Sequence, residues 1–226
     1  HFGTGTYFVG DEKQISDGTY GNRPHEKVDF SNYKMFKPLS ENEGFELHYA
    51  LKYINDNISL YPIATMTFDE AYDIKKKAED AEYDFYFRDD ATEAEKAEAK
   101  RTLDNLKERF ESIGYDPENW DSEKLYNKIK DIRAEYRSSI LHLQGIFSYR
   151  QDNGRLTYDG AEAKINSVLQ NVYNEVSQIE DAYNARYEDS PSTRFMKGMG
   201  YEGINVSGFK GLDNTKYGSV IYDLKG

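Results

Sequence analysis

The sequence predicts an α+β fold in which the two ends of the chain form a small β-sheet and a long helical segment lies between them. Glycine, threonine and aromatic residues alternate over residues 2–8, and apolar and aromatic residues follow a glycine again over residues 218–224. Both compositions are typical of short strands. In the middle of the chain, apolar side chains instead recur every three or four positions, which is the period of an α-helix. We therefore expect a core made of residues 1–65 and 189–226, interrupted by a helical insertion at residues 66–188.

Composition narrows the classes of function. A chain of 226 residues with 20 tyrosines and 12 phenylalanines can bury a full core. Its formal net charge of -12 opposes contact with phosphate backbones and anionic lipids, so we expect no broad nucleic-acid binding and no membrane binding. Cysteine is absent, which excludes disulfides and thiolate metal ligands. We expect a soluble protein of the cytoplasm or of a virion interior and, because it starts at His1, a piece of a longer protein.

The first part of the core is expected to contain one strand, one long loop and one helix. The strand covers residues 2–8, and turn signals at Asp17-Gly18 and at residues 20–24 predict a loop up to about residue 33. A short amphipathic helix follows at residues 43–54, because Leu47, Ala50, Leu51 and Ile54 share one helical face.

Two helices of the insertion are expected to begin at capping boxes, in which a threonine and a glutamate three residues later bond to each other's backbone N–H groups. Thr67 with Glu70 predicts one start, and Thr92 with Glu95 predicts the next. Gly114 is placed to end the second of these helices, since glycine adopts the left-handed conformation that follows many helices.

Two longer helices with coiled-coil-like spacing follow. Their apolar seams consist of Leu125, Ile129, Ile132, Tyr136, Ile140 and Leu143, and of Ile165, Leu169, Val172, Val176, Ile179 and Tyr183. We expect the seams to bury each other, with a tight turn at residues 151–154, and such helices would also support a helix-mediated oligomer. A short helix at residues 194–199 and a strand at residues 219–223 complete the prediction.

The stretch Phe-Gly-Thr-Gly-Thr-Tyr-Phe at residues 2–8 closely resembles the F-G-x-G-I-Y-F strand of poly-ADP-ribose polymerase and diphtheria-toxin-like ADP-ribosyltransferases. Residues 200–204 and 217–225 resemble, in the family's order, the closing G-Y-D-G-I and E-Y-V-V-F-D-x-x-x-I-K stretches of transferase-like domains in phage and mobile-element polyvalent proteins. The likeness covers roughly the first 55 and the last 35 residues. It implies an ADP-ribosyltransferase-like split β-sheet core with NAD as substrate, and it leaves the helical insertion unexplained.

The resemblance implies particular contacts to NAD. In the family, the glycines of this strand let the backbone approach the dinucleotide, and its tyrosine stacks on the nicotinamide ring. Both roles are physically reasonable, because residues without a Cβ allow close approach and a charged heterocycle favours an aromatic face. The residues that would line the NAD site are Gly3, Thr4, Gly5, Tyr7, Ser16 and Tyr20, with Tyr7 also in the catalytic set.

The rest of the family's catalytic set fits poorly. The family's histidine lies on an upstream strand that this sequence lacks, and its glutamate falls on Gly218. That carboxylate stabilises the oxocarbenium character that develops as nicotinamide leaves. Asp213, in the preceding Gly-rich loop, could supply a carboxylate instead, with plain turn chemistry as the alternative. Phe209 and Tyr217 occupy the place of the family's substrate-recognition loop, where they would contact an acceptor or pack within the loop.

Two functions therefore remain open from the sequence. The first is an ADP-ribosyltransferase that transfers ADP-ribose from NAD to a protein acceptor. The alternative is a catalytically degenerate structural or interaction module of a phage virion or mobile-element protein. We expect no metal site, because His25, His48 and His142 do not have the spacing of a metal-binding motif.

Overall fold

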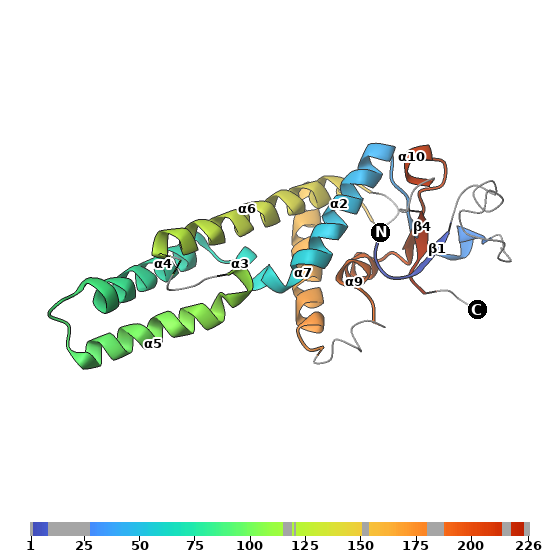
Figure 1. Cartoon of the computed structure of the whole chain (residues 1–226). Helices are drawn as coiled ribbons and strands as arrows, with labels where there is room; N and C mark the ends of the chain where they lie inside the picture. The colour runs from blue at the N-terminus through green and yellow to red at the C-terminus, as the bar shows by residue number, and fades with distance from the viewer. Residues whose placement is uncertain are drawn as a thin grey trace. The chain divides into compact units, whose positions relative to one another are not determined.

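The structure is a computed structural model that describes residues 2–8, 28–114, 119, 121–150, 154–179, 188–213 and 218–223. The fold is mixed α+β, as the sequence predicts, and it divides into two compact units. The sheet unit comprises His1–Ser59 and Ser139–Gly226, and the helical unit comprises Leu60–Ser138 (Figure 1). The two units meet at residues 59 and 60 and again at residues 138 and 139, whereas the sequence prediction places its boundaries at residues 65 and 66 and at residues 188 and 189.

The sheet unit is built around a small mixed sheet. Its elements are β1 (Thr6–Phe8), η1 (Phe30–Asn32), β2 (Met35–Phe36), α2 (Glu41–Asn57), the second half of α6 (Ser122–Phe147), α7 (Tyr158–Val176), α9 (Pro191–Gly198), β3 (Gly203–Ile204), α10 (Lys210–Asp213) and β4 (Ser219–Ile221). Within the described residues the strand order is β1-β4-β3-β2, with β3 and β2 parallel and the other pairs antiparallel. The core of this unit includes the fully buried side chains of Phe2, Phe36, Leu47, Leu51, Phe195, Tyr201 and Val220.

The helical unit packs four helices around a second core. The chain enters through η2 (Ile58–Leu60) and continues as α3 (Tyr61–Ala64), α4 (Phe68–Glu82), η3 (Tyr83–Phe87), α5 (Glu93–Arg109), η4 (Glu111–Ile113) and the first half of α6. Buried members of the core include Ile63, Ala71, Ile74, Leu106, Phe110, Leu125 and Ile129. Near the first and last residues of the unit, the rings of Tyr61 and Tyr136 meet edge to face with centroids 5.9 Å apart.

Both capping boxes are confirmed. The Thr67 side chain accepts from the N–H of Glu70, whose carboxylate accepts from the N–H of Thr67, and Thr92 and Glu95 repeat this arrangement. The end of α5 differs from the prediction. Gly114 is left-handed, with φ of 75°, but it ends the short turn η4, because α5 itself stops at Arg109.

The two coiled-coil-like seams lie on α6 and α7, except that Ile179 follows the end of α7 at Val176 and Tyr183 lies outside the described residues. The prediction that the seams bury each other is wrong for the first half of α6. Leu125 and Ile129 lie in the core of the helical unit, against residues of α4 and α5. Helix α7 packs on α9, where a Cβ on Gly198 would lie 2.6 Å from Val168 Cγ1. The spacing predicts a buried face but does not specify the surface that covers it. Of the expected turn at 151–154, residues 151–153 lie outside the described residues.

A buried arginine joins the end of α6 to the segment between β2 and α2. The guanidinium of Arg150 donates to the carbonyls of Ile146 at 2.8 Å and Lys37 at 2.9 Å, and it pairs with the Glu43 carboxylate at 2.6 Å. It also lies 4.1 Å from the ring centroid of Phe36. Since both charges are largely shielded from water, either one would be costly without the other.

We expect Arg150→Ala to lower the free energy of unfolding by about 3–5 kcal/mol, because it leaves the Glu43 carboxylate without its partner. Chemical denaturation followed by circular dichroism measures the change. The matched control is Arg155→Ala, whose guanidinium lies over Tyr149 at the surface and whose loss should change stability by less than about 1 kcal/mol. Equal losses in the two variants would contradict the proposed role of the buried ion pair.

Candidate functional site

The first and last strands of the chain lie side by side, as the sequence analysis expects. In the antiparallel pair of β1 and β4, Tyr7 is opposite Val220 and Phe8 is opposite Ser219. This pairing brings the glycine-rich segment that begins the chain next to the strand that closes it (Figure 1). The candidate site is therefore the region around Tyr7.

The hydroxyl of Tyr7 forms a hydrogen bond within its own segment. It donates to the carbonyl oxygen of Gly3 at 2.7 Å, and the side chain is half-buried. Burial raises the pKa of Tyr7 to about 12, although backbone hydrogen bonds involving Phe2 and Gly3 partly oppose the shift. Tyr222 lies close by, its hydroxyl donating to the carbonyl of Phe2 at 3.4 Å, and burial raises its pKa well above 10. Both phenols are therefore held neutral at physiological pH.

The segment from Gly3 to Gly5 lies against the beginning of α9. Ser190 is the N-cap of that helix, and Pro191 follows at its first position, a combination that favours a helix start. The N–H of Thr4 donates to Ser190 Oγ at 3.1 Å, and the N–H of Ser190 donates to Thr4 Oγ1 at 2.9 Å. Thr193 Oγ1 donates to the carbonyl of Thr4 at 2.8 Å. The N–H, hydroxyl and carbonyl groups of Thr4 are thus satisfied by protein atoms.

The close approach that the two glycines allow is made to the protein's own side chains and backbone. A Cβ on Gly3, where φ is 113°, would lie 2.4 Å from Thr193 Oγ1 and 2.8 Å from Ser192 Oγ. A Cβ on Gly5 would lie 2.7 Å from the carbonyl oxygen of Ile221. Packing against α9 and β4 is therefore a sufficient reason for glycine at both positions.

Gly218 stands beside the ring of Tyr7, at the place where the family carries its glutamate. Its backbone has φ of 35°, which side-chain-bearing residues rarely adopt. A Cβ there would lie 2.8 Å from the carbonyl oxygen of Phe8 and 3.7 Å from Tyr7 Cδ1. A glutamate at residue 218 would consequently require β1 to shift.

The other sequence-predicted residues divide into three groups. Ser16, Tyr20 and Tyr217 lie outside the described residues. Asp213 is the last residue of α10, and its side chain is not described. Phe209 lies just before α10 and is half-buried, its N–H donating to the carbonyl of Val206 at 3.1 Å. The structure therefore groups Gly3, Thr4, Gly5 and Tyr7 around the β1–β4 pair.

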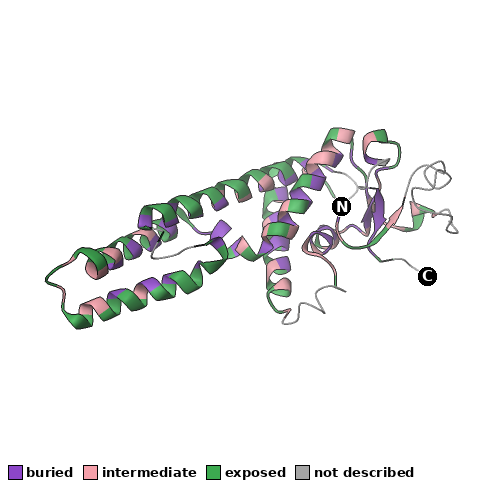
Figure 2. Cartoon of the chain, in the orientation of Figure 1, coloured by how far each residue is buried: buried purple, intermediate pink, exposed green. Residues whose placement is uncertain are grey.

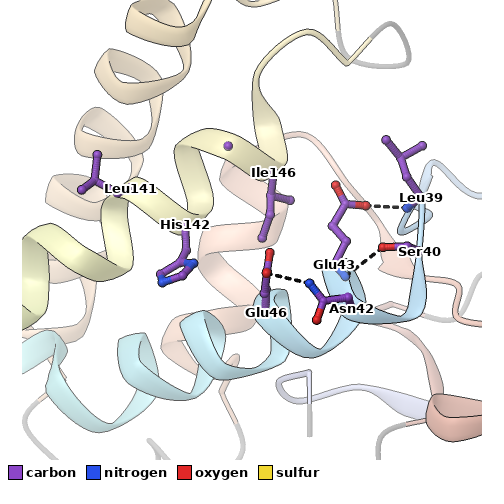
Figure 3. Close-up of a pocket in the computed structure, with 9 residues that line it drawn as sticks. Leu39, Ser40, Asn42, Glu43, Glu46, Leu141, His142 and Ile146 are labelled. Atoms are coloured by element: carbon purple, nitrogen blue, oxygen red, sulfur yellow. Dashed lines mark hydrogen bonds between the residues drawn. The ribbon is translucent and has the colours of Figure 1, made fainter.

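A separate cleft lies between the beginning of α2 and the end of α6 (Figure 3). It has a volume of about 400 Å³ and is lined by Leu39, Ser40, Asn42, Glu43, Glu46, Leu141, His142, Gly145 and Ile146. Asn42 donates to the carboxylate of Glu46 at 2.8 Å, and Glu43 is already paired with Arg150. The sequence analysis missed this cleft, because no sequence spacing indicates that Asn42 and His142, 100 positions apart, lie on the same cleft.

Two further kinds of site, a metal-binding cluster and a membrane-spanning helix, are absent from the described residues. No three His, Asp or Glu side chains gather there closely enough to hold a metal ion. Among the helices that the structure describes, none combines the length and apolar character needed to cross a membrane. His48 is buried against the edge of the Phe2 ring, with centroids 5.7 Å apart, which is a packing role.

Comparison with known proteins adds no relative. No family model matches the chain, and no curated protein or solved structure matches it either.

We expect Gly3→Ala to lower the free energy of unfolding by about 1–3 kcal/mol more than Gly154→Ala does. Both glycines have positive φ, 113° at Gly3 and 77° at Gly154, but nothing lies within 4 Å of a Cβ on Gly154. The difference therefore combines the contact with α9 and the greater backbone strain at Gly3. Chemical denaturation of both variants measures it. Equal destabilisation would show that the contact with Ser192 and Thr193 costs nothing.

We expect Tyr7→Phe to reduce stability by about 1 kcal/mol near neutral pH, because the hydrogen bond to Gly3 is lost. The raised pKa of Tyr7 means that folding favours the neutral phenol. The stability that the folded state gains from keeping this phenol neutral is fully present below pH 10.0 and is lost as the pH rises toward about 12. The free energy of unfolding, measured by chemical denaturation at pH values from neutral to about 11, should therefore fall less steeply with pH for Tyr7→Phe than for the wild type. Tyr149→Phe, at an exposed tyrosine, is the control, and parallel curves for all three proteins would contradict the assignment.

Proposed function

We propose that the chain is an ADP-ribosyltransferase-like domain that has lost the transfer chemistry and serves as a structural or interaction module of a phage or mobile-element protein. The sequence motifs at both ends support the family, and the pairing of β1 with β4 places the two motifs side by side, as the resemblance implies. The loss of transferase activity is inferred from Gly218, which lies beside the ring of Tyr7.

The observation that carries the proposal is the backbone at Gly218. Transfer of ADP-ribose needs a negative charge close to the ribose as nicotinamide departs, a contribution of several kcal/mol in the transition state. Gly218 has no carboxylate, and the Phe8 carbonyl is 2.8 Å from where even a Cβ would lie. At residue 218 the chain therefore has a closely packed glycine, where an active transferase of this family would have the catalytic glutamate.

The contacts of the glycine-rich segment support the same conclusion. Ser190 and Thr193 lie against residues 3–5 and satisfy the hydrogen-bonding groups of Thr4. The Tyr7 hydroxyl is engaged with Gly3. Binding NAD in the family's manner would require exchange of these internal contacts for ligand contacts, with little net gain.

The second candidate function is an active NAD-dependent transferase with a protein acceptor. One observation favours it: α10 ends at Asp213, in the same connection that leads to β4, so a carboxylate is available five residues from Gly218. In that case Asp213 would replace the family's glutamate, and Phe209 and Tyr217 would contact the acceptor.

We expect titration calorimetry of the full chain with NAD to show no saturable binding, which corresponds to a Kd above about 1 mM. Incubation with labelled NAD and with candidate acceptor proteins should give no transfer of label. Tyr7→Phe, which preserves the ring, and Tyr7→Ala should both match the wild type, with circular dichroism reporting that each variant is folded.

Micromolar binding that Tyr7→Ala abolishes would overturn the loss of NAD chemistry and favour the active transferase. Label transfer that Asp213→Asn removes would then assign the carboxylate. The matched control is Asp223→Asn, at a carboxylate just after β4 that is paired with Lys197 at 2.7 Å.

A further inference from the structure

The turn between α4 and α5 exposes aromatic side chains. We call residues 79–98 the hairpin tip, since they comprise the end of α4, the π-helical turn η3 and the start of α5. Within it, Tyr83 is 57% exposed, Tyr86 48% and Phe87 71%. Figure 2 shows this end of the helical pair coloured mainly as exposed and intermediate. Clustered exposure of large aromatic residues is a common mark of an interaction site.

The exposure arises because the hairpin tip contains only two layers of helix. Helix α6 begins at Ser122, whose N–H donates to the Glu82 carboxylate at 3.0 Å, so within the described residues the third helix starts level with the end of α4. Beyond that point, only a small cluster remains to bury side chains: Ala81, Ala99, Leu103 and the partly buried Phe85. Phe85 fills this cluster, which leaves its aromatic neighbours outside.

The hairpin tip is held in shape by ionic contacts. Arg88 donates to the carboxylates of Asp84 at 3.3 Å, Asp90 at 3.1 Å and Glu95 at 3.0 Å. Hydrogen bonds from Thr92, together with Arg88, lower the pKa of Glu95 to about 2, so its charge persists over the physiological range. A surface that is already ordered loses little entropy when a partner binds.

The charge around these aromatic side chains is strongly negative. Residues 79–98 contain nine Asp and Glu residues, and Arg88 and Lys96 are their only cationic residues. Arg88 is occupied by its three carboxylates, whereas Asp89 and Glu93 are exposed and form no ion pair with another described residue. Such a surface attracts cations and repels nucleic acid and anionic lipid.

We propose that the hairpin tip docks a lysine- and arginine-rich segment of a partner protein, with the cations lying over the exposed rings and between the carboxylates. Aromatic faces attract ammonium and guanidinium groups, and more strongly when water is displaced. The same unit already makes this contact at Tyr126, over which Lys75 and Lys130 lie at 5.5 and 5.3 Å from the ring centroid. The proposal is independent of the sheet, so it applies whether or not the sheet unit binds NAD.

The test uses fluorescence anisotropy with the full chain and a labelled dodecapeptide of alternating lysine or arginine and glycine. We expect saturable binding that weakens as salt increases. The double variant Tyr83→Ser with Phe87→Ser should weaken binding about tenfold, in the range of two exposed cation–π contacts. Its control is Phe68→Ser with Tyr72→Ser, an exposed stacked pair at the other end of α4, which should leave binding unchanged.

A second pair of variants separates site-specific charge from overall charge. Asp89→Asn with Glu93→Gln should weaken peptide binding several-fold, whereas Glu108→Gln with Glu111→Gln makes the same change in net charge away from the hairpin tip and should not. Equal effects of the two pairs, or no saturable binding by the wild type, would overturn the proposal. So would self-association in sedimentation experiments that only the Tyr83→Ser, Phe87→Ser variant loses, since the occupant would then be a second copy of the chain.

Discussion

The sheet unit depends on the close contact of three segments: residues 3–5, the beginning of α9 and β4. The segment at Gly3 to Gly5 lies between the hydroxyl groups that start α9 and the backbone of β4, and neither side leaves room for a Cβ. Because Ser190 and Thr193 bond to Thr4, the segment is fixed to the helix at the same time as Tyr7 and Phe8 extend the sheet. Lys197 strengthens the arrangement by pairing with Asp189 at 2.6 Å and Asp223 at 2.7 Å, which links α9 to the end of β4.

The same contact explains how one sequence motif can serve two purposes. A strand with glycines and a following tyrosine allows close approach, but the motif does not specify what approaches. In a dinucleotide site the ligand would take that place, and here a helix N-terminus does. The hydroxyl side chains of Ser192 and Thr193 are short enough to lie against Gly3, and that of Thr193 donates to the carbonyl of Thr4. A nucleotide function and a packing function therefore leave similar traces in the sequence.

Local signals in the sequence were sufficient for most helices, whereas the pairing of the terminal strands was indicated by the family resemblance of the two end motifs. Thr67 and Thr92 mark helix starts because their chemistry is completed within four residues. The packing of distant segments was harder to predict. Leu125 and Ile129 pack on α4 and α5 rather than on α7, and the apolar spacing of α6 would be the same with either partner. The two-residue strand β2 is too short for any periodicity, and the Arg150–Glu43 pair joins positions more than 100 residues apart. At the candidate site, the sequence placed Tyr7 opposite the last strand but could not indicate that its hydroxyl would bond to Gly3.

The edge-to-face contact of Tyr61 and Tyr136 has an evolutionary consequence. These residues stand where the chain enters and leaves the helical unit, so the two crossing points are neighbours in space. An insert whose ends lie together can be lengthened, shortened or exchanged with little strain on the host, because the entropy of closing such a loop grows only slowly with its length. The helical unit is thus a segment whose length could change during evolution with little strain on the rest of the chain.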